Sequence, residues 1–260
     1  MNQTKINRKI IVSHRRCKKL GLQKTIISPI IILKKDELKL RLRKNDKLIN
    51  IFKNCIESIT SPIKNKYIFI LTDCEGYLLE MVYEKKKYLY IDKYNFKIGM
   101  SFSEHSIGTN AISIAMEMKK TICLKPHEHY CEILKKWYCI AAPLLINDKD
   151  IIGYIDISTI EERIVDEMIL CFELLREKIC NEYKMLITRE KECLKESLTD
   201  KQINVLRLCA KGYKEAVISE ELKINIATVK YHKKQIIYKL QTKSIQEAVA
   251  KAVKLNLISI

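Results

Sequence analysis

The sequence of 260 residues predicts an α+β fold: an antiparallel sheet with helices, then a connector helix, then a group of four short helices. Strand-like stretches lie in the middle of the chain without regular βαβ alternation. Apolar residues follow at helical spacing, and the last quarter of the chain carries several helix start and stop signals.

The strand signals begin with residues 67–80, where an apolar run enters an Asp-Cys-Glu-Gly turn and a second apolar run leaves it. This pattern predicts a hairpin in which Gly76 adopts a positive φ. Residues 137–145 form a second β-rich stretch, which Pro143 is expected to break, and residues 151–157 return as another strand. Helical segments between these runs indicate a sensor-like domain around an antiparallel sheet.

The connector, residues 161–197, shows apolar residues spaced alternately by three and four positions, with a gap at Glu182. These residues are Val165, Met168, Phe172, Leu175, Ile179 and Leu186. Two interpretations fit the spacing. The helix either pairs with its twin along a short heptad seam, or it packs on its own sheet.

Residues 198–260 carry the helix signals. Thr199 with Gln202, and Ser244 with Glu247, match the capping box at a helix start. Gly212 is placed to end the first helix, because glycine readily takes the left-handed conformation found there. Asn225 is placed to cap the third helix, after a short turn that follows a helix ending near Leu222.

The helix after Asn225 has two distinct faces at about 100° per residue. The apolar face holds Val229, Ile236 and Leu240, and the opposite face holds Lys230, Tyr231, Lys234 and Tyr238. Such a helix after a short turn is typical of a helix-turn-helix unit, whose second helix enters the DNA major groove. Lysine donates to guanine O6 and N7, and an aromatic ring contacts a thymine methyl.

The whole of residues 198–260 resembles the LuxR-type DNA-binding domain. The matching residues are Leu198, Thr199, Val205, Leu206, Gly212, Leu222, Ile224, Thr228, Val229, Lys230, His232, Ile236, Lys239, Leu240, Ser244, Glu247, Ala248 and Val249. The resemblance implies double-stranded DNA as the partner. It also implies base contacts from Lys230, Tyr231 and Lys234, and phosphate contacts from Thr228, Lys239 and Lys243.

The same resemblance implies a homodimer, often joined through the last helix, where the small Ala248 and Ala252 would allow close approach. The sequence departs from the family at four positions: Gln202 and Asn204 replace usual acidic residues, Val217 replaces Glu, and Ile245 replaces Arg. These losses put the positioning of phosphate contacts in doubt, and not the fold.

The charge distribution agrees with a polyanion partner. Residues 1–60 hold 16 Lys and Arg against 4 Asp and Glu, residues 61–197 hold 20 against 22, and residues 198–260 hold 12 against 5. Basic ends suit DNA, and the near-neutral middle does not. We therefore expect four segments: a helical basic lead-in at 1–60, a sensor domain at 61–160, the connector at 161–197, and the DNA-binding domain at 198–260.

The middle segment resembles the GAF domain of acetoin-catabolism-type activators. The matching residues are Glu104, Gly108, Thr109, Asn110, Ala111, Glu128, His129, Tyr130, Trp137, Cys139, Ala141, Ala142, Pro143, Gly153, Asp156, Ile157 and Ser158. Residues 11–17 and 37–49 resemble the helical lead-in of that group, although His14 replaces its usual Trp. The resemblance implies a small-molecule effector, with Glu104, Thr109, Asn110, His129 and Trp137 as candidate lining residues. The alternative is that Thr109 and Asn110 only cap a helix and Trp137 is plain core.

Those activators continue into an ATPase domain that acts on the sigma-54 polymerase, but this sequence has no G-x-x-x-x-G-K-[ST] phosphate loop. We therefore expect no enzyme activity. The implied function is a transcription regulator that recruits or blocks ordinary RNA polymerase.

His127, His129 and Cys131 are the one set that suggests a metal, because nitrogen and sulfur ligands suit zinc, copper or iron. Their spacing places all three on one face of an expected strand, and no fourth ligand is evident. We therefore expect a structural role, with no metal and no cofactor.

Two other functions remain open. Asp73 follows an apolar strand, as a phosphorylated aspartate of a response regulator does, but the early acidic pair and the later lysine of a receiver are not visible. A thiol enzyme or redox sensor would use Cys74, Cys123, Cys131 or Cys139, although nothing in the sequence indicates a lowered thiol pKa. Ten scattered cysteines without a C-x-x-C pair or a signal peptide predict reduced thiols and a cytoplasmic protein. The apolar run at 26–33 is too short to cross a membrane, which takes roughly 20 residues.

Overall fold

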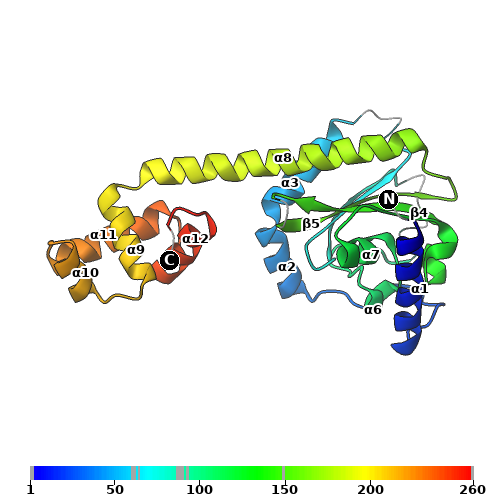
Figure 1. The fold of residues 1–260 in the computed structure, drawn as a ribbon, viewed down its shortest axis with the longest axis horizontal. Helices are drawn as coiled ribbons and strands as arrows, with labels where there is room; N and C mark the ends of the chain where they lie inside the picture. The colour runs from blue at the N-terminus through cyan, green and yellow to red at the C-terminus, as the bar shows by residue number, and fades with distance from the viewer. Residues whose placement is uncertain are drawn as a thin grey trace. The chain divides into compact units, whose positions relative to one another are not determined.

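The computed structural model describes residues 3–59, 63, 65–85, 91, 94–147 and 150–258 (Figure 1). They fall into two compact units, Met1–Tyr183 and Lys184–Ile260. The first is a mixed helix and sheet unit and the second is helical, so the predicted α+β class is confirmed. None of the helices within the described ranges is both long and apolar enough to cross a membrane.

The first unit is built around a five-stranded antiparallel sheet in the order β2-β1-β5-β4-β3. The strands are β1 (Ile68–Thr72), β2 (Leu78–Val82), β3 (Ile122–Leu124), β4 (Trp137–Leu145) and β5 (Ile151–Ile160). The hairpin predicted at 67–80 is present, and Gly76 has the positive φ that its turn requires, 81°.

Pro143 does not break its strand, contrary to expectation. It lies within β4 and pairs with Tyr154 of β5. On its other side β4 is paired with β3 only over Cys139–Ala141. Proline lacks the N–H that a central strand needs on both sides. It is tolerated here because β4 has lost one neighbour by the time it reaches Pro143.

Helices cover both faces of this sheet (Figure 1). On one face, α3 (Asp46–Glu57) and the first half of α8 (Asp166–Ser197) pack against the side chains of Ile155 and Ile157. On the other face lie α1 (Gln3–Lys19), α6 (Glu104–Ile107) and α7 (Ala111–Met118). Successive residues of a strand point to opposite faces, so Tyr154, Asp156 and Ser158 face the second group.

Shorter elements complete the unit: α2 (Lys35–Lys44) and the 3-10 turns η1 (Pro126–Glu128) and η2 (Glu132–Leu134). The basic lead-in is part of both cores. Ile6 and Ile10 of α1 belong to one apolar cluster, and Leu48 and Phe52 of α3 belong to the other.

The apolar residues of the connector pack against the sheet of the same chain. Met168, Phe172, Leu175 and Ile179 of α8 are all buried in the cluster that contains α3 and the sheet. Val165 and Leu186, at the ends of the predicted seam, are exposed. Of the two interpretations, packing on the same chain is therefore the one that the structure shows for these four residues.

The second unit contains α9 (Asp200–Ala210), α10 (Glu215–Glu221), α11 (Ile226–Lys239) and α12 (Ile245–Lys254). The predicted capping box of α9 is formed: Thr199 Oγ1 accepts from the N–H of Gln202, and Gln202 Oε1 accepts from the N–H of Thr199. Ser244 caps α12, but Glu247 accepts from the N–H of Lys243, so the second box is formed only in part.

Ala248 and Ala252 are fully buried in the core of this unit. They were expected to face a second copy of the chain, and that expectation is wrong. Their small size lets α12 approach α9 within the same unit, because close approach of two helices requires short side chains.

Candidate functional site

The second unit presents a helix-turn-helix. α10 ends at Glu221 with Leu222 as its C-cap, and Lys223 takes a positive φ of 51° while the N–H of Ile224 donates to the carbonyl oxygen of Ser219. Asn225 then caps α11 by accepting from the N–H of Thr228 at 2.7 Å. A tight helix end followed directly by a capped helix start sets the turn between the two helices.

α11 has the two faces that its sequence predicted. Val229, Ile236 and Leu240 are buried, and the residues of the other face, Lys230, Tyr231, Lys234 and Tyr238, are exposed. Tyr231 and Tyr238 keep 59% and 80% of their surface exposed, which is unusual for aromatic residues of a small domain. This face offers ammonium donors and aromatic rings, the groups that read base edges.

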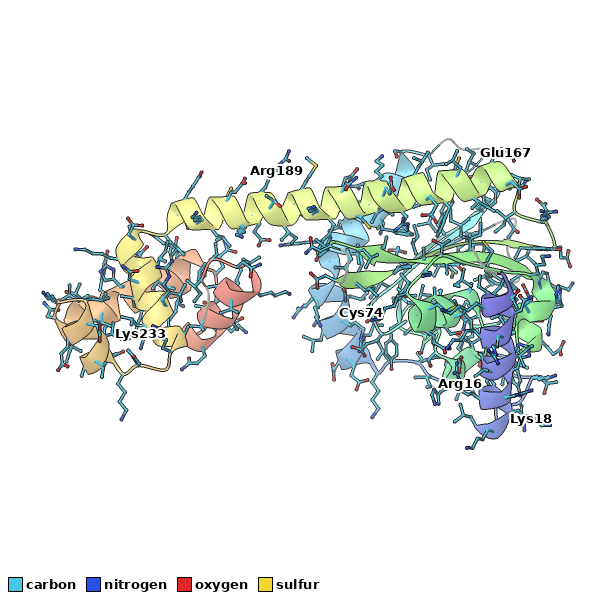
Figure 2. The ribbon with its side chains drawn as sticks, viewed as in Figure 1. Arg16, Lys18, Cys74, Glu167, Arg189 and Lys233 are labelled. Carbon is cyan, nitrogen blue, oxygen red and sulfur yellow. The ribbon has the colours of Figure 1, made fainter. Side chains whose placement is uncertain are left out.

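Lys233, labelled in Figure 2, serves a different purpose. Its Nζ lies 2.8 Å from Glu215 Oε1 of α10, and the hydrogen bond lowers the pKa of Glu215. Lys230 approaches the other oxygen of Glu215 only to 4.0 Å and is largely exposed. Glu215 therefore holds α10 to α11 mainly through Lys233, and Lys230 stays available at the surface.

The three predicted phosphate contacts differ in availability. Lys243 is exposed. Thr228 is half-buried, and its hydroxyl donates to Asn225 Oδ1. Lys239 is engaged within the unit, where its ammonium donates to Ser197 and Gln202. A phosphate contact from Lys239 would require these two hydrogen bonds to break.

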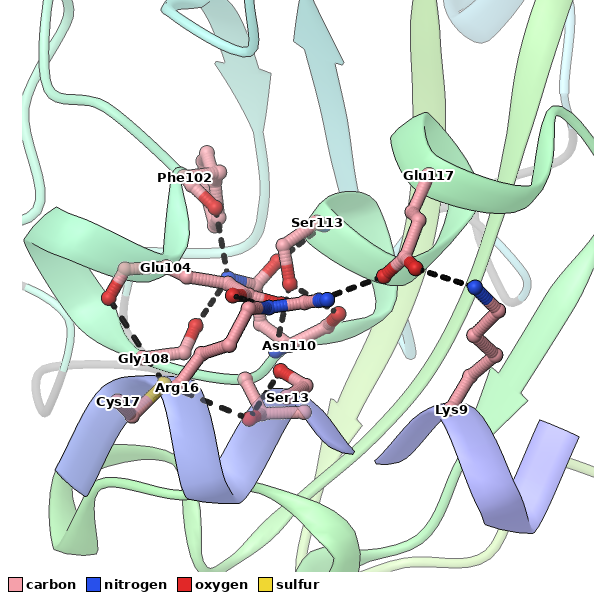
Figure 3. Close-up of polar contacts among 11 residues, drawn as sticks. Lys9, Ser13, Arg16, Cys17, Phe102, Glu104, Gly108, Asn110, Ser113 and Glu117 are labelled. Atoms are coloured by element: carbon pink, nitrogen blue, oxygen red, sulfur yellow. Dashed lines mark hydrogen bonds and ion pairs between the residues drawn. The ribbon is translucent and has the colours of Figure 1, made fainter. Parts of the chain in front are cut away.

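In the first unit, two of the five predicted effector residues bind α1 (Figure 3). The carboxylate of Glu104 accepts from Arg16 Nε at 2.8 Å and from Arg16 Nη2 at 2.7 Å. Thr109 Oγ1 lies 2.6 Å from Ser13 Oγ, and both residues are buried. Glu104 and Thr109 therefore anchor α1.

Asn110 is a helix cap with every polar atom in use. Its Oδ1 accepts from the N–H of Ser113, and its Nδ2 donates to the carbonyl oxygens of Phe102 and Gly108 at 2.7 and 2.8 Å. An amide carries one acceptor group and two donor hydrogens, so Asn110 has no free donor for a ligand.

His129 is also buried, and it contacts a thiol. Its Nε2 lies 3.5 Å from Cys139 Sγ, and burial lowers the pKa of His129 to about 4. The expected strand at 127–131 is absent, because Pro126 starts a 3-10 turn there. Among the residues that the structure describes, no group of three His, Cys, Asp or Glu side chains is placed to hold a metal ion.

Trp137 and Asn110 are the two predicted residues that the structure brings together. Both line a small closed cavity between α7 and the sheet, with Asp156, Ser158 and Cys139. Asp156 and Ser158 were not among the predicted effector residues. The available signal was a carboxyl group in the middle of an otherwise apolar strand, where ionisable residues are rare unless they serve a function.

A larger cleft of about 610 Å³ lies between β3, β4 and the start of α8, and it is open. Cys139 reaches it, but none of the five predicted effector residues lines it. Its charged side chains include Arg163 and Asp166, which are mostly exposed and lie 3.6 Å apart. Solvated charges of this kind bind weakly, so the closed cavity is the better built of the two.

Residues 196–252 match the family described as bacterial regulatory proteins, luxR family. This segment is a LuxR-type DNA-binding domain. Its departures from the family are tolerated by the fold: Ile245 packs against the core of the LuxR-type domain, and Val217 lies at its surface.

Relatives of the chain are transcription regulators. It is 26% identical over 159 residues to the acetoin dehydrogenase operon transcriptional activator AcoR of Bacillus subtilis (strain 168), which covers 61% of this chain and 26% of that protein. It is also 26% identical over 149 residues to a signal-transduction and transcriptional-control protein of Clostridium beijerinckii, covering 56% of this chain and 23% of that one. The chain thus spans about a quarter of the length of these relatives.

The fold has a counterpart among solved structures. A chain of the crystal structure of the E. coli DhaR(N)-DhaL complex superposes with a TM-score of 0.63 at 17% identity, covering 70% of this chain and 62% of that one. At this identity the likeness concerns the fold alone.

Asp73 does not resemble a phosphoacceptor. Its Oδ1 accepts from the N–H groups of Glu75 and Tyr77, each at 2.9 Å, and its Oδ2 accepts from Arg41. A phosphoacceptor must expose its carboxylate to a phosphate donor, whereas Asp73 is buried and holds the β1–β2 turn together.

The buried cysteines Cys55, Cys131 and Cys139 do not resemble catalytic thiols. Burial raises the pKa of Cys131 to about 12 and of Cys55 to about 11, and it raises that of Cys139 well above its usual value. A nucleophilic thiol requires the opposite shift, because the thiolate is the reactive form.

Proposed function

We propose that this LuxR-type regulator binds double-stranded DNA as a homodimer, under the control of a small effector held by its N-terminal domain. The observation that carries the proposal is α11, which buries one face completely and exposes lysines and tyrosines on the other. Lys230, Tyr231 and Lys234 are the proposed base contacts, and Thr228 and Lys243 are the proposed phosphate contacts.

Effector control is supported by the N-terminal domain. The N-terminal domain resembles a GAF domain, and it contains a closed cavity with buried polar groups. Buried ionisable groups in a cavity are typical of functional sites. The name of the B. subtilis relative mentions an acetoin dehydrogenase operon, so acetoin is the first compound to test.

A homodimer is proposed because helix-turn-helix proteins read two half-sites with two copies of the domain. Since the apolar spacing of α8 serves the protein's own sheet, the dimer contact is expected elsewhere. Contact with RNA polymerase is proposed as the means by which the bound protein changes transcription.

The experiment is to sequence genomic fragments captured by the purified chain at about 0.15 M salt, where non-specific binding is weak. It is run without effector, with acetoin, and with cell extract. We expect enrichment of a short, two-fold symmetric site whose occupancy changes with acetoin or with extract. The double variant Lys230→Met with Lys234→Met should lose enrichment, whereas Lys254→Met, an exposed lysine of α12, should keep it.

Absence of any enriched site under all three conditions would contradict DNA recognition. An enriched site whose occupancy never changes would contradict effector control alone.

A further inference from the structure

An acidic residue lies next to the lysines of the recognition helix α11. Residues 198–260 hold 12 Lys and Arg against 5 Asp and Glu. Within residues 198–258, Glu215 is the acid of both ion pairs that the structure shows. A negative group beside the residues that contact DNA opposes the attraction of a polyanion. Its position at this surface therefore points to a role other than overall affinity.

Glu215 is the first residue of α10 and contacts two lysines of α11 unequally (Figure 2). Its Oε1 lies 2.8 Å from Lys233 Nζ, and its Oε2 lies 4.0 Å from Lys230 Nζ. The side chain of Lys233 is 23% exposed and that of Lys230 is 66% exposed. The hydrogen bond with Lys233 lowers the pKa of Glu215, so the carboxylate is ionised at neutral pH. Lys233 thus fixes the carboxylate in place, and Lys230 is the lysine that DNA can reach.

The carboxylate acts on Lys230 through its charge. A separation of 4.0 Å is too long for a hydrogen bond, so all three N–H donors of the Lys230 ammonium stay available. The two lysines and the carboxylate together carry a net charge of +1, whereas the lysines alone would carry +2. Glu215 therefore weakens the positive field around Lys230 without using its donors.

Phosphates and bases respond differently to such a change. Phosphates are anions, and their attraction to a protein depends on net charge and not on sequence. Guanine O6 and N7 are neutral acceptors, which require a correctly placed N–H donor. A carboxylate near Lys230 is therefore expected to weaken its binding to phosphates more than its binding to guanine.

We infer that Glu215 is a specificity-determining residue of the DNA-binding surface, because its carboxylate lowers the affinity of Lys230 for phosphates and leaves the donors of Lys230 free for guanine. The inference rests on the proposed base contact of Lys230 and adds a positioning residue that acts through it. Lys233 serves the same purpose indirectly, since it holds the carboxylate beside Lys230.

The test compares the affinity of the full chain for two duplexes by fluorescence anisotropy at about 0.15 M salt. One duplex is the site enriched from genomic fragments, and the other is a shuffled sequence of the same composition. Glu215→Gln keeps an oxygen acceptor for Lys233 and removes the charge. We expect it to raise affinity for the shuffled duplex about fivefold, the effect of one unit charge about 4 Å away in water. Affinity for the site should change less than about twofold.

Two controls separate this local effect from a change in net charge. Glu220→Gln removes the same charge from an exposed position of α10, about 140° around the helix from Glu215. It should leave the ratio of the two affinities unchanged. On the shuffled duplex, the effect of Glu215→Gln should vanish when Lys230→Met is also present and persist when Lys234→Met is present instead.

A second measurement uses the native chain. Guanines of the site are replaced one at a time by 7-deazaguanine, which lacks the N7 acceptor. We expect weaker binding at one position at least, and the Lys230→Met variant should be insensitive to that replacement. This measurement also covers the case in which thermal melting shows that Glu215→Gln is unfolded. Absence of any sensitive guanine would overturn the inference.

The inference also fails if Glu215→Gln keeps the native affinity ratio, if Glu220→Gln changes the ratio equally, or if the effect persists with Lys230→Met. In those cases preference of the native chain for its site would still support DNA recognition. If the ratio falls as expected but no compound or extract changes occupancy, the inference stands and effector control is wrong. If the native chain binds both duplexes equally, DNA recognition is wrong and the inference falls with it.

Discussion

Lys239 Nζ lies 2.7 Å from the carbonyl oxygen of Ser197 and 2.8 Å from Gln202 Oε1. The last turn of α8, the first turn of α9 and the end of the recognition helix α11 therefore meet at one ammonium group. Gln202, which replaces a usual acidic residue, accepts from the lysine as a neutral partner. The departure from the family pattern thus keeps the contact and removes the charge pair.

We expect Lys239→Met to destabilise the LuxR-type domain by roughly 1–2 kcal/mol, because two partly buried acceptors lose their donor. Lys243→Met, at an exposed position, should leave stability unchanged and lower the salt dependence of DNA binding by about one phosphate contact. Thermal melting and affinity at several salt concentrations measure the two effects. The opposite assignment, a normal melt and a lower salt slope for Lys239→Met, would make Lys239 a phosphate contact.

Leu174 and Leu175 are neighbours in α8 with different surroundings, at 58% and 7% exposure. We expect Leu175→Ala to lower the free energy of unfolding of the N-terminal unit by roughly 2–5 kcal/mol, because it leaves a cavity in a packed core. Leu174→Ala should change it by less than about 0.5 kcal/mol. Urea denaturation of the two variants gives the comparison. If both variants changed the free energy of unfolding by the same small amount and also lost the dimer mass, helix pairing along the heptad seam would be supported instead.

Asp156 and His129 should give the N-terminal unit opposite pH dependences. The folded pKa of Asp156 is raised from 3.8 to about 7, so its contribution to stability falls as pH rises through this window. The folded pKa of His129 is lowered from 6.5 to about 4, so its contribution falls as pH falls through that window. Each of the two pKa shifts corresponds to a change of roughly 3–4 kcal/mol in the free energy of unfolding across its pH window.

Asp156→Asn should therefore gain stability relative to the native chain as pH rises between about 4.5 and 7.5, and His129→Gln should gain as pH falls. Denaturation at a series of pH values measures both differences. Cys139, which contacts His129, keeps a raised pKa and does not titrate in this window. Differences that do not depend on pH would show that neither group has a shifted folded pKa.

Substitutions of Asn110 distinguish a role as a helix cap from a role as a ligand contact. Asn110→Ala removes one acceptor and two donors from buried partners, and we expect a loss of roughly 2–4 kcal/mol. Asn110→Asp keeps the acceptor for the Ser113 N–H and should lose less. Urea denaturation ranks the three proteins. A variant with native stability and no effector response would identify Asn110 as a ligand residue instead.

Local signals were predictable from the sequence. The caps at Thr199 and Asn225, the end of α9 at Gly212 and the hairpin at Gly76 are all set by residues within a few positions of each other. The buried face of α11 follows from periodicity alone. In each case the interaction partner is close along the chain, so its identity can be read from the spacing.

Long-range packing was not predictable in the same way. A spacing of three and four in α8 describes an apolar stripe and does not say whether a twin helix or the chain's own sheet covers it. Glu104 and Thr109 matched an effector-site pattern, but their polar groups bind Arg16 and Ser13 of α1, which lie 88 and 96 residues earlier in the chain. Asp156 and Ser158 matched the GAF resemblance without being predicted as effector residues, and only the three-dimensional structure places them beside the cavity between α7 and the sheet.

Trp137 is the one tryptophan of the chain, and it lies in the sensor-like unit, whereas the LuxR-type domain carries only tyrosines. Its emission therefore reports on one unit without contribution from the other. A chain with two units need not unfold in a single step, and intrinsic fluorescence resolves the first unfolding event without a label. Tyr231 and Tyr238 are exposed on α11, where stacking or contact with DNA would alter their emission.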